Sequence, residues 1–204
     1  MGIQDREHLE VAKADEIVAW LEVNHASSPG LWIVTYKKVA KLPAPTYDEI
    51  VRAALRFGWV DSVPGKVDEL RAKLYISPRK PDSAWAQTNK VRIEELVAQG
   101  LMHPAGMAKV DEAKASGAWN KIDSAQNAEI PDDLSAAFEL HPSSRENFEA
   151  FPKGVRKQIL EWIAQAKTEP TRAKRVTETA TLAAQNIRAN QWRDGQKAAS
   201  KPAN

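Results

Sequence analysis

The segment 47–107 constrains the fold most strongly, because helix-type and strand-type patterns alternate within it. Its first helix is predicted to follow a capping box formed by Thr46 and Glu49, and Gly58 is placed to end that helix. The elements predicted after this helix are strands at 60–63 and 74–77 and helices at 84–98 and 104–116. Strands and helices in this order predict an α+β fold.

A further strand is predicted upstream, in the apolar, β-branched and aromatic run at 31–36. A helix is predicted before it at 14–24, where apolar residues recur at helical spacing, and the Ser-Ser-Pro-Gly sequence at 27–30 is a turn. Pro64 and Gly65 are expected to break the chain between the second and third strands. The N-terminal part therefore predicts a small antiparallel sheet with helices.

The pattern becomes helical throughout the C-terminal part of the chain. Ser143 and Glu146 form a second predicted capping box, and Trp162 belongs to an apolar stripe with helical spacing. The stretch before this part is polar and aperiodic, which is typical of a linker. The predicted organisation is an α+β domain at 1–119, a linker at 120–130, a helical segment at 131–192 and a disordered tail at 193–204.

The composition excludes several kinds of site. The chain contains no Cys, so it has no disulfide, no thiolate metal site and no cysteine nucleophile. Its four His are widely spaced without a paired pattern of metal ligands. The sequence also lacks the GxGxxG, P-loop, GxSxG and HExxH motifs. We therefore expect no metal site, no cofactor and no residue of a known catalytic motif.

The sequence also bears on the compartment. No apolar run approaches the roughly 20 residues that a membrane span needs. The acidic start of the chain lacks the apolar core of a signal peptide. A chain without Cys suits a reducing compartment. We expect a cytoplasmic protein without a membrane span.

A series of short motifs occurs in one order between Leu31 and about Leu182. They are Leu31-Trp32, Phe57-Gly58-Trp59-Val60-Asp61, Ser77-Pro78-Arg79-Lys80, Ser83-Ala84-Trp85 with Asn89, Arg92-Ile93-Glu94-Glu95-Leu96, Gly100-Leu101-Met102-His103-Pro104-Ala105-Gly106, Pro131-Asp132-Asp133-Leu134, Ala166-Lys167 and Thr171-Arg172-Ala173-Lys174-Arg175-Val176. In this order the motifs resemble those of the bacterial YdeI or OmpD-associated, bacteriocin-protection family. The resemblance implies an N-terminal α+β unit of the frataxin/YjbR type and a C-terminal helical segment. It also implies a cytosolic bacterial protein linked to envelope or antimicrobial stress, and it brings no established catalytic residue.

One candidate binding site lies around the second and third predicted strands. Trp59 and Asp61 are two positions apart, so on a strand they would share one face. If Arg79 or Lys80 faced them, a small polar pocket walled by Trp59 and Trp85 would result, in which a guanidinium could bind a carboxylate or phosphate. The alternative is that both Trp are core residues and that Asp61 pairs with Arg79 or caps a turn.

A second candidate site is basic. The C-terminal quarter of the chain has eleven Lys and Arg against four Asp and Glu, whereas the rest has 18 against 23. Arg172, Lys174 and Arg175 lie near a predicted helix N-terminus, where free N–H groups already favour anions. Either they bind phosphate or nucleic acid, or they pair with Asp132 and Asp133 of the same chain. The alternation of basic and aromatic residues that marks single-strand binding is weak here.

These observations favour a non-enzymatic protein of envelope-stress or antimicrobial-peptide tolerance that acts by binding a protein or an anionic ligand. The alternative is a small-molecule sensor or an unrecognised enzyme that uses Trp59, Asp61, Arg79 and Trp85. A filled core at these residues would favour the first hypothesis, and an open pocket would favour the second.

Overall fold

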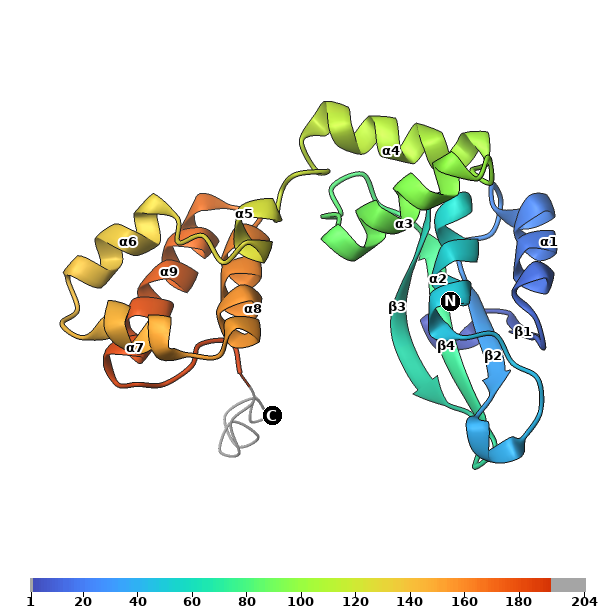
Figure 1. The fold of residues 1–204 in the computed structure, drawn as a ribbon, viewed down its shortest axis with the longest axis horizontal. Helices are drawn as coiled ribbons and strands as arrows, with labels where there is room; N and C mark the ends of the chain where they lie inside the picture. Colours follow the sequence, from blue (N-terminus) through green and yellow to red (C-terminus); the bar gives the residue numbers. More distant parts are fainter. Residues whose placement is uncertain (1, 192–204) are drawn as a thin grey trace, which may run out of the picture. The chain divides into compact units, whose positions relative to one another are not determined.

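The computed structural model describes residues 2–191 and is α+β, as the sequence predicts (Figure 1). Contacts divide the chain into two units, of which the first ends at Asn120 and the second begins at Lys121. The first unit contains η1 (Ile3–Asp5), β1 (His8–Glu10), α1 (Ala14–Asn24), β2 (Leu31–Tyr36), η2 (Lys38–Ala40), α2 (Tyr47–Arg56), β3 (Trp59–Lys66), β4 (Arg71–Pro78), α3 (Gln87–Ala98) and α4 (Pro104–Ser116). The second contains α5 (Asp123–Gln126), α6 (Asp132–Glu139), α7 (Ser144–Ala150), α8 (Lys153–Ala164) and α9 (Glu169–Ala184).

The sheet of the first unit has its strands in the order β1-β2-β4-β3. β4 pairs antiparallel with β2 and with β3, whereas β1 pairs parallel with β2. The sheet is therefore mixed and not purely antiparallel as predicted, because a three-residue strand such as β1 leaves no readable alternation in the sequence. β2 has a neighbour on each side, and its first four residues are buried, which accounts for its continuous apolar run.

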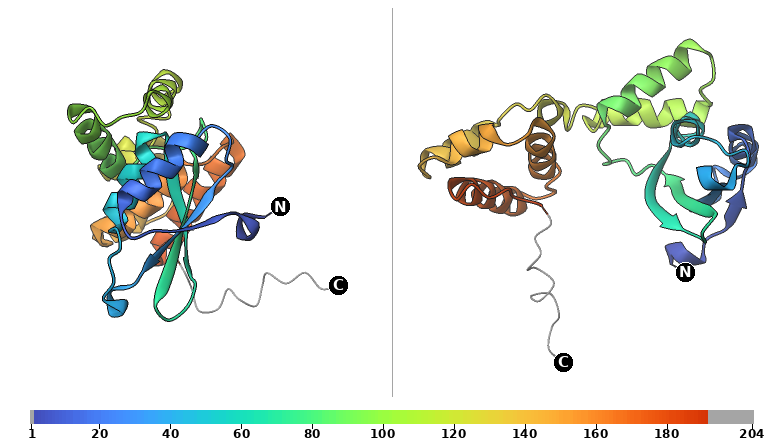
Figure 2. Two further views of the ribbon diagram at one scale, coloured as in Figure 1. Left: turned by 90° about the vertical axis from the view of Figure 1, so that its right-hand side faces the viewer. Right: turned by 60° about the horizontal axis from the view of Figure 1, so that its bottom comes forward.

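The β3–β4 hairpin is longer than the sequence indicates, and its curvature is visible in Figures 1 and 2. Pro64 and Gly65 do not break the chain but lie inside β3, and the turn comes after Lys66. The register shifts between Asp61 and Pro64, so a bulge accommodates the irregular backbone. β3 is also an edge strand of the sheet, and proline is tolerated there because fewer ladder hydrogen bonds are lost.

Helix α2 separates two apolar clusters. Ile50, Ala54 and Phe57 pack with α1 and with the strands on one side of the helix. Val51 and Leu55 pack on the other side with α3, α4 and the segment before α3. Because α2 contributes to both clusters, it ties the sheet to the α3–α4 pair.

The ends of α2 follow from local chemistry. The Thr46 hydroxyl accepts from the Glu49 amide at 3.3 Å, and the Glu49 carboxylate accepts from the Thr46 amide at 2.7 Å, which confirms the predicted capping box. Gly58 follows the helix with φ of +72°, a left-handed conformation that favours glycine. Gly106 of α4 approaches α2 so closely that a Cβ there would lie 2.1 Å from the Arg56 carbonyl oxygen.

The second unit is built from helices (Figure 1), and they surround one apolar cluster. The segment 120–130, predicted as a linker, contains α5, and its Ala125 is buried in this cluster. Polar flanking residues hide that short helix in the sequence. Ser143 precedes α7 with φ of +65° and its side chain makes no capping bond, so the second capping box is absent. The predicted tail at 193–204 lies outside the described residues.

Three large aromatic residues of the first unit lie in its core. Trp32, Phe57 and Trp59 are 1–2% exposed, whereas Trp162 is half-buried at the edge of the helical cluster. Within residues 2–191, no helix combines the length and the apolar character needed to cross a membrane.

Candidate functional site

Trp59 is a core residue of the first unit. Its indole packs in the cluster between α1, α2 and the sheet and meets the ring of Trp20 edge-on, with centroids 5.9 Å apart. The indole N–H donates to the His25 carbonyl oxygen at 3.3 Å. All faces of the side chain are therefore used within the fold, and Trp59 does not wall a pocket.

Trp85 belongs to the other cluster of the same unit. It is 1% exposed, packs with Leu55 of α2 and with α3 and α4, and lies 5.0 Å from the ring of Trp119. Trp59 and Trp85 therefore sit in different cores. The predicted pocket with these two indoles as its walls is replaced by two filled apolar clusters.

Arg79 is the unusual residue of this region. It follows β4 and is only 5% exposed, with its guanidinium carbon 3.8 Å from the centroid of the Trp85 ring. Nη2 donates to the carbonyl oxygen of Ala84. Among the described residues, no acceptor lies within hydrogen-bond distance of Nε or Nη1, although both atoms are shielded from solvent. Burial lowers the pKa of Arg79 to about 10, and the charge of Asp61 opposes that change.

Neighbouring arginines differ from Arg79 because they have carboxylate partners. Arg92 of α3 donates through Nε to Asp48 at 2.8 Å, and Arg52 lies 2.5 Å from Asp48 and 2.6 Å from Glu95. These ion pairs hold α3 against α2. By contrast, no ion pair to Arg79 is present in the described part of the chain, so a buried cation remains only partly compensated.

Asp61 lies on the same side of the sheet as Trp59, as their alternation predicted. Its carboxylate accepts a hydrogen bond of 2.7 Å from the hydroxyl of Tyr47, the first residue of α2. Burial and this hydrogen bond raise the pKa of Tyr47 to about 12. The sequence gives no sign of this hydroxyl, since the position of Tyr47 at helical spacing suggests only an apolar contact. Lys80 is solvent-exposed and belongs to neither core.

The three basic residues of α9 have separate environments. Arg172 forms two hydrogen bonds with the carboxylate of Asp133, at 2.7 and 3.0 Å. Arg175 donates to the carbonyl oxygen of Trp162, and its guanidinium carbon lies 4.9 Å from the centroid of that indole. Lys174 is exposed. The structure therefore favours the intramolecular alternative for the two arginines, with Asp133 as the acidic partner.

The second unit also carries a groove of about 480 Å³ over α6 and α7. Its lining includes the apolar Phe138 and three carboxylates, Glu139, Glu146 and Glu149, with one arginine, Arg145. Arg145 lies 3.8 Å from Glu139 and 3.7 Å from Glu149. The groove is thus acidic and does not suit the anionic ligand predicted for this part of the chain.

Two family models match different parts of the chain. Residues 9–109 match a domain of unknown function, and residues 127–186 match the family described as bacteriocin-protection, YdeI or OmpD-associated. The resemblance predicted from the sequence is therefore confirmed for the second segment. The motifs at 57–61 and 77–80, which also carried that resemblance, fall within the first match. No curated protein and no solved structure matches the chain.

Proposed function

We propose that the protein acts in bacteriocin or envelope-stress tolerance by binding an anionic ligand, because residues 127–186 match the family described as bacteriocin-protection, YdeI or OmpD-associated. The binding residue we propose is Arg79, in the unit that matches the domain of unknown function. The first unit would then recognise the ligand, and the second would supply the protective role that the matched bacteriocin-protection family suggests.

The single observation that carries this proposal is the state of the Arg79 guanidinium. A buried charge is costly unless it is paired and hydrogen-bonded, and each unsatisfied buried group calls for a partner. Arg79 donates one hydrogen bond from Nη2, whereas Nε and Nη1 have no acceptor among the described residues. A carboxylate or phosphate would supply both the missing acceptors and the missing negative charge. We therefore assign the ligand to small organic anions with one of these groups.

The surroundings of Arg79 support ligand binding rather than catalysis. Stacking on Trp85 holds the guanidinium plane in place, which reduces the entropy that binding would otherwise cost. The hydroxyl that donates to Asp61 belongs to Tyr47, and the pKa of Tyr47 is raised to about 12. A phenol with that pKa is almost fully protonated near neutral pH, so it is a poor general base. This supports a receptor rather than an enzyme at this site.

A second candidate function is small-molecule sensing at the same residue. Because Nε and Nη1 are shielded from solvent, an anion can reach them only if neighbouring groups move. Ligand binding would then be coupled to a local conformational change, which is what a sensor requires. Such coupling should slow association below the rate typical of a preformed site.

We place this binding in the cytoplasm, which the absence of Cys suits. The proposal can be tested with a thermal-shift screen of carboxylate- and phosphate-containing metabolites. A ligand at 100 times its dissociation constant stabilises a protein by about 2.7 kcal/mol, which corresponds to roughly 5–10 °C in a chain of this size. Arg79→Met should abolish the shift.

Lys80→Met is the matched control, because Lys80 is the adjacent cation and is exposed. It should retain the full shift, and cells that produce it should keep bacteriocin tolerance, whereas cells with Arg79→Met should lose tolerance. If no anion stabilises the parent protein, or if Arg79→Met responds like the parent, the proposed receptor site is wrong.

A further inference from the structure

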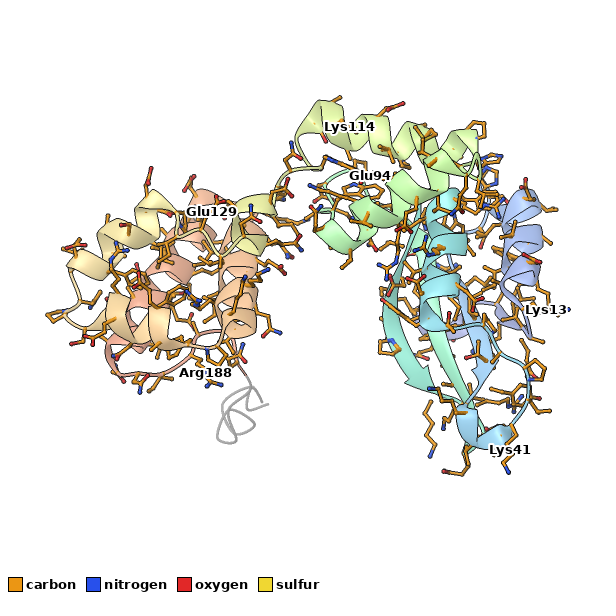
Figure 3. The ribbon with its side chains drawn as sticks, viewed as in Figure 1. Lys13, Lys41, Glu94, Lys114, Glu129 and Arg188 are labelled. Atoms are coloured by element: carbon orange, nitrogen blue, oxygen red, sulfur yellow. The ribbon has the colours of Figure 1, made fainter. Side chains whose placement is uncertain are left out.

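A distinct surface lies at one end of the sheet, where two loops of the first unit meet. The first loop follows β2 and the second is the β3–β4 turn; together, residues 37–42 and 66–71 are called the sheet tip. The ammonium group of Lys37 donates to the backbone carbonyl oxygens of Asp68 at 2.7 Å and Glu69 at 3.2 Å. The backbone amide of Lys37 donates to the carbonyl oxygen of Leu70 at 2.8 Å. Figure 3 labels Lys41 on this tip. The two loops are therefore one continuous surface.

Large aliphatic side chains point outward on the sheet tip. Val39 is 69% exposed, Leu42 52%, Val67 40% and Leu70 49%. Single exposed apolar residues are ordinary, but four on two adjoining loops form a patch, and such patches mark interaction sites. The two clusters of this unit do not include any of the four, so packing does not account for them.

Lysines accompany these aliphatic residues. Lys38 and Lys41 are exposed, and in the described part of the chain neither forms an ion pair. The two acidic residues of the tip are already engaged, because Asp68 pairs with Arg71 at 2.7 Å and Glu69 pairs with Lys66. The tip thus presents uncompensated positive charge next to exposed aliphatic groups.

The backbone of the tip is largely satisfied from within. The amides of Ala40, Lys41, Val67 and Leu70 all donate to acceptors in the tip, at 2.9–3.2 Å. A free amide would resist transfer out of water, since an unsatisfied backbone group in an apolar medium costs several kcal/mol. With these amides bonded, the cost of moving this part of the backbone into a less polar phase is reduced.

We propose that the sheet tip docks on membrane surfaces that contain anionic phospholipids. Aliphatic side chains would enter the boundary between headgroups and acyl chains, and Lys38 and Lys41 would lie at the level of the lipid phosphates. Single-stranded nucleic acid would also attract lysines, but its bases bind by stacking on aromatic rings, and the tip residues include none. This inference is independent of the anion site at Arg79.

Cosedimentation of the full chain with lipid vesicles tests the proposal. The protein should sediment with vesicles of phosphatidylcholine mixed with phosphatidylglycerol, and not with phosphatidylcholine alone. Each lysine near such a surface contributes a roughly fivefold gain, so Lys38→Gln combined with Lys41→Gln should lower the partition coefficient about 30-fold. Lys13→Gln, an exposed lysine of another region, should leave it unchanged.

A second measurement reports insertion directly. Because the chain contains no Cys, Val39→Cys creates a single position for an environment-sensitive dye. Its emission should shift to the blue when anionic vesicles are added, whereas Val23→Cys, at an 80% exposed position of α1, should show no shift. Failure of the parent to sediment with anionic vesicles, equal sedimentation with neutral vesicles, or an equal dye response at both positions would each overturn the proposal.

Discussion

Replacing Arg79 with methionine should leave the stability of the ligand-free protein almost unchanged, although Arg79 is among the most buried charged residues described. Burial lowers the pKa of Arg79 from its ordinary value to about 10, which corresponds to a penalty of about 3 kcal/mol for keeping the cation inside. The opposing contributions are the hydrogen bond to Ala84, about 1.5–3 kcal/mol, and the contact with Trp85, about 0.5–2 kcal/mol. These nearly cancel, so we expect a change within about 1 kcal/mol.

The pH of the measurement matters for this argument. The folded-state pKa of Arg79 lies below the unfolded value, so above about pH 10 the unfolded chain binds more protons than the folded one. The penalty is therefore fully present below about pH 10 and is relieved only as the pH rises above it. Urea unfolding at neutral pH, followed by circular dichroism and tryptophan fluorescence, measures the whole penalty.

The comparison variant is Trp85→Ala, which removes a fully buried indole and should cost about 3–5 kcal/mol. If Arg79→Met alone lowered stability by more than about 3 kcal/mol without ligand, the guanidinium would be a structural group, because a loss of that size is typical of breaking a buried ion pair. The proposal that Nε and Nη1 of Arg79 bind an anion would then be wrong.

Three further predictions concern other parts of the chain. The raised pKa of Tyr47 means that its contribution to stability is present below pH 10 and is lost as the pH rises through about 12; ultraviolet titration should show a late phenol that disappears in Tyr47→Phe. Gly106→Ala should lower stability by about 1–3 kcal/mol in urea unfolding, despite the better helix propensity of alanine, whereas Gly154→Ala, with open space around its Cβ, should not. Arg172→Ala should cost about 1 kcal/mol because it breaks a partly buried ion pair, whereas Lys174→Ala should be neutral; equal effects would contradict the pairing.

The sequence predicted those elements whose signals are local. The helix at Ala14–Asn24 has the predicted bounds, and α2 starts at its predicted cap because both partners of the capping box lie within four residues. The start of α3 was predicted at residue 84 but lies at Gln87. The extra residues stay extended because Trp85 is buried in the core and Arg79 binds the carbonyl of Ala84. Such tertiary demands leave no trace in helical spacing.

In the candidate site, too, the sequence predicted local features and missed those that depend on tertiary packing. The common face of Trp59 and Asp61 follows from strand alternation, and the prediction places them correctly. The assignment of Trp59 and Trp85 to different cores depends on α2 lying between the two clusters, which no short motif reveals. The missing acceptors of Arg79 are also invisible in the sequence, because they depend on which carbonyls and carboxylates happen to approach it.

The short strand β1 protects the protein against aggregation. It covers one side of β2 through the pairs His8 with Trp32 and Glu10 with Val34. Without it, β2 would become an open edge with a run of apolar and β-branched residues, which is the kind of segment that recruits further strands from other molecules. A truncation that removes these few residues should therefore promote aggregation before it measurably lowers the melting temperature.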